Sequence, residues 1–208
     1  VSFCVEPGAI MGFIGRNGAG KSTTLKAMLN LVHPDSGAVR MFGMDFYENE
    51  LACKQALGVV LGGVDFYANK KVRTVTDVTR RFYPQWEEEK YRHYLKLFEL
   101  DENKKISQLS AGMRVKYMLA LALSHDAKLL ILDEPTSGLD PVSRDELTAL
   151  FRGVVADGER SILFSTHITS DLEKCASHIT MIQNGQILCS DTKAGFLARY
   201  QELGATLE

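Results

Sequence analysis

Short apolar runs alternate along the chain with longer stretches of helical spacing. The runs that we expect to be buried strands cover residues 10–14, 59–61, 129–132, 161–165 and 179–183. We expect helices from residue 21 to about 33, at 48–57, in a long stretch that ends at 124, and at 142–156 and 170–175. Strands that alternate with helices predict an α/β fold with a mostly parallel sheet, covered by helices on both faces.

A small antiparallel β portion is expected beside the parallel sheet. Residues 179–183 and 186–189 flank an Asn-Gly pair, which is typical of a two-residue hairpin turn. Residues 1–5 alternate between apolar and polar, and the Glu-Pro-Gly that follows them predicts a hairpin with the strand at 10–14. Residues 38–42 indicate another short strand.

Helical patterns replace the apolar strands in the middle of the chain. The stretch at 87–98 carries one apolar stripe, formed by Tyr91, Tyr94, Leu95 and Phe98, which we expect to be a core face. We therefore expect one domain over residues 1–208, with a helical subdomain of about residues 64–118 inserted into the α/β core. Because the sequence begins with Val1 inside an expected strand, we also expect an N-terminal segment to precede it.

The amino-acid composition of the chain makes several classes of function less favoured. Hydrophobic residues make up 45% of the chain and charged residues 24%, as in globular proteins, and the net charge of -2 gives no general attraction for nucleic acid. The four cysteines form no Cys-x-x-Cys pair, so neither a zinc site nor a disulfide framework is indicated. The apolar runs are too short to span a bilayer.

Residues 15–23 read Gly-Arg-Asn-Gly-Ala-Gly-Lys-Ser-Thr and follow an apolar run. A strand that enters a glycine-rich turn and then a helix presents several backbone N–H groups to one point, where the helix dipole adds positive charge. Lys21 can reach the outer phosphates of a nucleotide, and the Ser22 hydroxyl can ligate Mg²⁺. We call this segment the phosphate loop. Its candidate nucleotide-binding residues are Gly15, Asn17, Gly18, Ala19, Gly20, Lys21, Ser22 and Thr23.

Two other strands end in residues suited to phosphate chemistry. The run at 129–132 ends in Asp133 and Glu134, and the run at 161–165 is followed by Thr166 and His167. Parallel sheets gather their sites at the carboxyl ends of strands. We therefore expect Asp133 to hold Mg²⁺ with Ser22, Glu134 to act as the general base on water, and His167 to contact the γ-phosphate.

A second anion-binding helix end is expected at residues 109–113, which read Leu-Ser-Ala-Gly-Met. Ser110 supplies a capping hydroxyl to the start of the long helix that ends at residue 124, where backbone N–H groups are free. One nucleotide has no obvious use for two such sites in one chain.

In the order of its motifs, the whole chain resembles the nucleotide-binding domain of the ATP-binding cassette (ABC) family, which implies a phosphate-loop NTPase core. The phosphate loop resembles the family's Walker A loop, residues 109–113 its signature segment, residues 129–134 its Walker B strand with the catalytic glutamate, and His167 its switch histidine. The family's D-loop matches Ser137, Gly138, Leu139 and Asp140.

The resemblance accounts for the second anion site, because two domains of this family pair head to tail. It implies that Ser110, Ala111 and Gly112 of one copy close on the γ-phosphate held by the phosphate loop of another. ATP and Mg²⁺ are the implied cofactors. The implied dimer forms with an identical chain or with a homologous cassette.

Three positions depart from the family's pattern. Ala111 and Met113 replace a glycine and a glutamine of the usual signature segment, Leu-Ser-Gly-Gly-Gln. Gly62 stands where the family places the glutamine of its Q-loop, and Asp65 is the nearest candidate to replace it. The aromatic residue that stacks on adenine would lie in the expected preceding segment.

The resemblance implies an ATP-binding and ATP-hydrolysing subunit of a membrane transporter, similar to bacterial exporters. Such a subunit lies at the cytoplasmic face of the membrane and drives a transmembrane permease on a separate chain. One alternative is a non-transport ABC ATPase that acts on ribosomes, DNA or cofactor assembly, although the charge favours no nucleic acid. Another is a regulatory cassette that binds ATP only, which Lys21, Asp133, Glu134 and His167 disfavour.

Overall fold

The computed structural model describes residues 1–61 and 67–205, and its side chains through residue 199. Gly62 and Asp65 lie outside these residues. The strands are β1 (Ile10–Ile14), β2 (Arg40–Met41), β3 (Met44–Asp45), β4 (Leu57–Val60), β5 (Leu129–Asp133), β6 (Ser161–Thr166), β7 (His178–Gln183) and β8 (Gln186–Thr192). The helices are α1 (Lys21–Met28), α2 (Glu50–Gln55), α3 (Val72–Thr79), α4 (Glu88–Leu97), α5 (Ala111–Ser124), α6 (Pro141–Val154), α7 (Thr169–Cys175) and α8 (Lys193–Ala205), with 3₁₀ turns η1 (Arg80–Phe82) and η2 (Ile106–Gln108).

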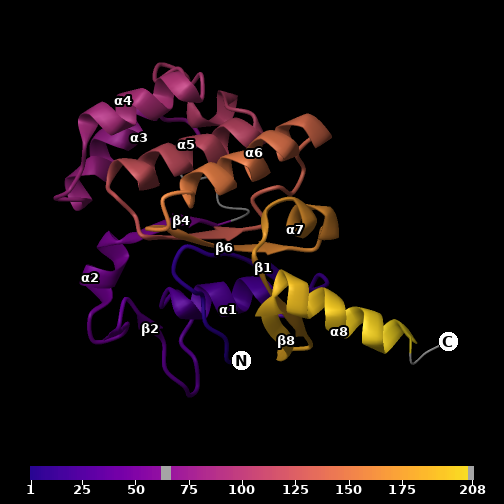
Figure 1. Cartoon of the computed structure of the whole chain (residues 1–208). Coiled ribbons are helices and arrows are strands. Elements are labelled where there is room, and N and C mark those ends of the chain that lie inside the picture. The colour runs from indigo at the N-terminus through magenta and orange to yellow at the C-terminus, as the bar shows by residue number, and fades with distance from the viewer. Residues whose placement is uncertain (62–66, 206–208) are drawn as a thin grey trace.

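One sheet of strand order β4-β5-β6-β1-β7-β8 forms the centre of the molecule (Figure 1). The pairs β4–β5, β5–β6, β6–β1 and β1–β7 are parallel, and only β8 runs antiparallel to its neighbour β7. Strands β2 and β3 form a separate antiparallel pair. The expected α/β fold with a mostly parallel sheet and a small antiparallel portion is confirmed.

Residues of the central strands alternate between two hydrophobic clusters, one on each face of the sheet. In β5, Leu130 and Leu132 belong to the cluster that includes α5, α6 and α7, whereas Ile131 belongs to the cluster that includes α1. Side chains that point alternately to two buried faces produce a continuous apolar run. Helices α5, α6 and α7 accordingly lie on one side of the sheet in Figure 1, and α1 and α2 on the other.

The hairpin expected between residues 1–5 and β1 is wrong. Residues 1–5 form no strand, because β1 pairs with β6 on one side and β7 on the other and so has no free edge. The segment instead packs by its side chains. The rings of Phe3 and Phe13 stack with centroids 5.3 Å apart, and Val5 packs on the same cluster.

Helices α3, α4 and α5 are joined by a buried polar contact. Thr76 Oγ1 lies 2.7 Å from the Tyr91 hydroxyl and 2.9 Å from the Tyr117 hydroxyl. The expected apolar stripe of α4 is a core face, since Tyr91, Leu95 and Phe98 are at most 8% exposed. Helices α3 and α4 thereby form a layer over α5 (Figure 1).

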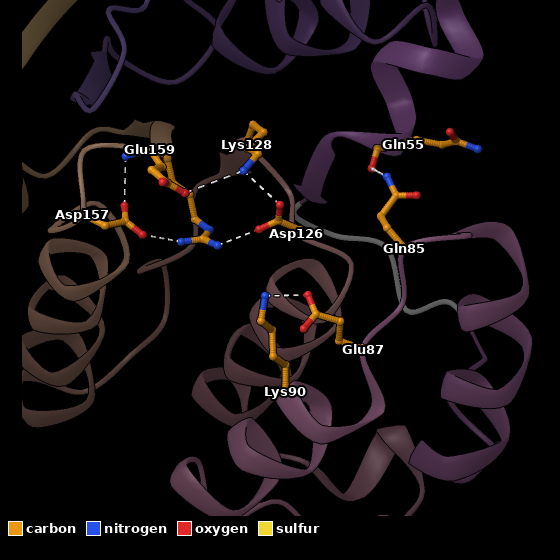
Figure 2. A network of polar contacts seen from close by, with 9 residues as sticks. Gln55, Gln85, Glu87, Lys90, Asp126, Lys128, Asp157 and Glu159 are labelled. Carbon is orange, nitrogen blue, oxygen red and sulfur yellow. Dashed lines mark hydrogen bonds and ion pairs between the residues drawn. The ribbon is translucent and has the colours of Figure 1, made fainter.

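At the amino ends of β5 and β6, ion pairs hold the connecting loops together. Arg160 Nη2 lies 2.7 Å from Asp126 Oδ1, and Lys128 Nζ lies 2.9 Å from Asp126 Oδ2. Figure 2 shows this network next to the contact in which Gln85 Nε2 donates to Gln55 O at 3.5 Å. The network therefore lies where the α3–α4 layer meets the sheet.

The C-terminal helix α8, which sequence analysis did not predict, packs against β8 and β7. Its Phe196 contacts the cluster on the α5 face of the sheet. Among the helices of residues 1–61 and 67–205, none has both the length and the apolar character needed to cross a membrane.

Candidate functional site

Three of the predicted segments meet at one edge of the sheet. Strands β5, β6 and β1 are neighbours, with Asp133 opposite Ser165 and Ile14 opposite Thr166. The phosphate loop follows Ile14, Glu134 follows Asp133, and His167 follows Thr166. Parallel register alone therefore brings the three segments to the same edge.

The shape of the phosphate loop depends on its glycines. A Cβ on Gly15 would lie 2.5 Å from Ile182 O and 3.1 Å from Ala19 Cβ, so no side chain fits there. Gly20 has φ 108, a left-handed conformation that L residues rarely adopt. Gly20, the N-cap residue of α1, has no side chain that could cap the first turn, so backbone N–H groups of that turn can face an anion.

Lys21, Glu134 and His167 form a chain of polar contacts. Lys21 Nζ donates to Gly15 O at 2.7 Å and lies 3.3 Å from Glu134 Oε1. The other carboxylate oxygen of Glu134 lies 3.4 Å from His167 Nδ1. The Lys21 side chain is only 4% exposed, whereas those of Glu134 and His167 are 26% and 40% exposed. The carboxylate is thus oriented from both sides and still reachable by water.

Ser22 and Asp133 place two oxygen atoms side by side. Ser22 Oγ donates to Asp133 Oδ1 at 3.1 Å, and Ser165 Oγ donates to the same oxygen at 2.6 Å. Within the part of the chain that the structure describes, no cluster of three or more His, Cys, Asp or Glu could hold a metal ion. Hydroxyl and carboxylate oxygens suit Mg²⁺, which commonly takes its other ligands from phosphates and water. The residues present fit that ion.

Ser165 is a site residue that sequence reasoning missed. Besides its bond to Asp133, its Oγ accepts the backbone N–H of Glu134 at 2.9 Å. Glu134 has φ 48, a left-handed conformation that is uncommon for a residue other than glycine. The sequence placed Ser165 at the end of an expected strand. It did not indicate that this strand is the neighbour of β5, and without that knowledge Ser165 could not be recognised as a site residue.

The signature segment lies at the start of α5. Ser110 is exposed, and its Oγ accepts the backbone N–H of Met113 at 3.2 Å, which confirms the predicted helix cap. A Cβ on Gly112 would lie 3.7 Å from Leu139 Cδ2, so the signature segment adjoins the D-loop. Asp140 caps α6 by accepting the N–H groups of Val142 and Ser143. Within the D-loop, Ser137 and Gly138 are exposed, so both segments present surface to solvent.

A cavity of about 890 Å³ connects the two regions. Ser22, Asp133 and Glu134 line it, and so do Ala111 and Ser137. Most of the remaining lining is apolar and comes from β4, α3 and α5. Its size is that of a small-molecule site, and its acidic residues, Asp133 and Glu134, lie at the end of β5 beside the phosphate loop.

A family model described as "ABC transporter" matches residues 1–137. The chain is 35% identical over 186 residues to the bacitracin transport ATP-binding protein BcrA of Bacillus licheniformis, covering 88% of this chain and 61% of that protein. It is 35% identical over 191 residues to Nod factor export ATP-binding protein I of Burkholderia lata, covering 89% of this chain and 62% of that protein. A solved ATP binding subunit of an ABC transporter superposes with a TM-score of 0.84 at 26% identity, covering 97% of this chain and 85% of that one. The chain thus spans less than two thirds of the length of these two curated relatives.

Proposed function

Because the chain belongs to the ABC transporter family, we propose that it is the ATP-binding and ATP-hydrolysing subunit of a membrane transporter. The observation that carries the proposal is the arrangement at the sheet edge. There, Ser22 contacts Asp133, and the Glu134 carboxylate lies between Lys21 and His167. These side chains supply the phosphate, metal and base functions that hydrolysis of a nucleoside triphosphate requires.

In the proposed reaction, the phosphate loop and Lys21 bind the phosphates of ATP. Ser22 and Asp133 would hold Mg²⁺, which would supply positive charge beside the phosphoryl oxygens. Glu134 orients the attacking water and accepts its proton, and His167 holds the Glu134 carboxylate and contacts the γ-phosphate. Ser165 fixes both Asp133 and the backbone of Glu134.

The proposed active form is a head-to-tail dimer, with an identical chain or a homologous cassette. Ser110, Ala111 and Gly112 of one copy would complete the phosphate site of the other. Two observations support this arrangement. Ser110 and Ala111 are exposed, and so are Ser137 and Gly138 of the neighbouring D-loop. Free N–H groups at the start of α5 suit a phosphate presented from outside the chain.

The proposed partner is a transmembrane permease on a separate chain, with this subunit at the cytoplasmic face of the membrane. Two curated relatives are named for bacitracin transport and for Nod factor export, which supports a bacterial exporter. A membrane protein should co-purify with the subunit. Capture of rRNA, DNA or a cofactor-assembly scaffold instead would support a non-transport ATPase.

The change Glu134→Gln tests the proposed reaction. It keeps the size of the side chain and removes the base, so we expect ATP affinity to persist while turnover falls by about 100-fold or more. Turnover is measured as phosphate release, and affinity by titration with a fluorescent ATP analogue. Glu159→Gln is the control, since Glu159 is exposed and pairs with Lys128 in the loop network of Figure 2. Hydrolysis by Glu134→Gln at the wild-type rate would contradict the assignment of the base.

A further inference from the structure

A buried polar cluster joins the segment after β5 to α6 and α7. It consists of Thr136, Arg144 and Asp171, which we call the buried triad. Thr136 Oγ1 donates to Asp171 Oδ2 at 2.6 Å, and Arg144 Nε lies 3.8 Å from Asp171 Oδ1. Thr136 is 1% exposed, Asp171 is fully buried, and the Arg144 side chain is 23% exposed but has a buried Nε. The triad is distinct from the residues that line the phosphate site.

Packing alone does not explain this cluster. A carboxylate without contact to water is costly unless other groups compensate it fully. Here the compensation is partial, because Asp171 Oδ1 and Arg144 Nε are both buried and have no hydrogen-bond partner among the described residues. Apolar side chains of similar size would often be as stable in such a place. The hydrogen bond from Thr136 is therefore the contact that fixes the carboxylate.

Each member of the triad belongs to a segment that carries a predicted site residue. Thr136 lies two residues after Glu134, and Asp171 lies four residues after His167. Arg144 lies in the first turns of α6, and its Nη2 donates to Leu139 O at 3.3 Å, which ties it to the D-loop. One buried carboxylate thus connects the segments of the base, the histidine and the D-loop.

The backbone around Thr136 needs such an anchor. Glu134 is in a left-handed conformation, which persists only where surrounding contacts hold it. Two successive turns follow, in which Ser137 N donates to Glu134 O at 3.1 Å and Leu139 N donates to Thr136 O at 3.2 Å. Ser165 holds this segment at its start, and the Thr136 hydroxyl holds its middle.

We propose that Asp171 is a positioning residue for hydrolysis. It acts through Thr136 on the placement of Glu134, and through Arg144 on the D-loop. This inference rests on the proposed ATPase function. In this proposal, the buried triad fixes the position of Glu134 relative to the D-loop and does not contact the nucleotide.

The pair Thr136→Val and Thr136→Ser tests the proposal. Valine keeps the shape of threonine and removes the hydroxyl, whereas serine keeps the hydroxyl. We expect Thr136→Val to lower kcat for ATP by about tenfold or more, because small displacements of a catalytic group are costly, while KM changes by less than about twofold. Thr136→Ser should restore most of the wild-type kcat. Steady-state phosphate release by the full chain gives both constants.

Thr148→Val is the matched control, since Thr148 is also 1% exposed but its Oγ1 donates to Asp145 O within the same helix. Its kcat should match that of the wild type. If Thr136→Val does not fold, Arg144→Gln tests the contact between Asp171 and Arg144. We expect the kcat of this variant to fall several-fold with KM unchanged. The proposed role of the triad is wrong if the variant tested has the wild-type kcat, or if Thr136→Ser loses as much kcat as Thr136→Val. If Glu134→Gln still lacks activity in that case, the proposed function stands by itself.

Discussion

At the residue scale, Glu134 depends on groups from three other segments. Lys21 and His167 contact its carboxylate oxygens, and Ser165 accepts its backbone N–H. In the proposed reaction, bound phosphates compete with Glu134 for the Lys21 ammonium, because both are anions. ATP binding would thereby release the carboxylate to accept a proton from water.

Another titratable residue, His125, is buried and has a structural role. Its ring stacks on Tyr83 with centroids 3.6 Å apart and planes 11° apart, and only 2% of the residue is exposed. Burial lowers the pKa of His125 from the usual 6.5 to about 4, because the charged ring would lose its contact with water, although hydrogen bonds with backbone groups and the charge of Asp126 oppose the shift. The imidazole is therefore neutral in the folded protein at neutral pH.

This lowered pKa predicts a loss of stability in mild acid. Between about pH 6.5 and about pH 4, the unfolded chain binds a proton at His125 that the folded chain does not bind, so stability falls as the pH falls through that range. The full effect is on the order of 3 kcal/mol. We expect His125→Phe, which can still stack on Tyr83, to reduce the drop in urea unfolding free energy between about pH 7.5 and about pH 5.

His93→Phe is the control for this experiment, because His93 is exposed on α4. It should keep the pH dependence of the wild type. An unchanged pH dependence in His125→Phe would show that His125 does not couple protonation to folding.

At the element scale, the position of α5 over the sheet depends on one glycine in β4. A Cβ on Gly58 would lie 2.5 Å from Ala122 Cβ and 2.4 Å from Leu130 Cδ2. Ala122 is on α5, and the Cβ of an alanine cannot move without its backbone. The close approach of β4 and α5 therefore requires glycine, and α5 carries the signature segment at its start.

Gly58→Ala should destabilise the fold by about 1–3 kcal/mol, because the added methyl forces α5 away from the sheet. Gly153→Ala, near the end of α6, is the matched control, since its added Cβ meets no atom within 4 Å. It should raise stability by roughly 0.5–1 kcal/mol through helix propensity. Denaturant unfolding measures both changes, and equal effects of the two substitutions would refute the packing argument.

At the scale of the whole molecule, the proposed dimer makes each phosphate site from two chains. Lys21→Ala damages the phosphate loop, and Ser110→Arg damages the signature segment. A head-to-tail dimer of the two variants has one site with both defects and one intact site. We therefore expect each variant alone to hydrolyse ATP poorly, and an equal mixture to recover about a quarter of the wild-type rate, since about half of the dimers are mixed.

The control mixes Lys21→Ala with a chain that carries both substitutions, in which no intact site can form. It should recover nothing. If the first mixture also recovers nothing although the mixed dimer is detected, each phosphate site lies within one chain and the head-to-tail arrangement is wrong.

Local sequence determined the central strands, the helices that follow them and the positions of the candidate site residues, although it missed α8 and wrongly predicted a strand at residues 1–5. The phosphate loop, the acidic pair at the end of β5 and the histidine after β6 each follow an apolar strand, so their common edge could be predicted from parallel pairing. The cap on α5 was also predictable, because a serine at a helix start bonds to a nearby N–H. These features depend on residues that are close in sequence.

Tertiary structure alone decided which distant groups meet. That β6 lies between β5 and β1 placed Ser165 on Asp133 and left residues 1–5 without a strand partner. The meeting of Thr136 with Asp171, and of Gly58 with Ala122, follows from how helices pack on the sheet. Such contacts could not be predicted from local patterns. The spacing of residues along the chain indicates which face of a helix or strand a residue occupies, but not which other element packs against that face.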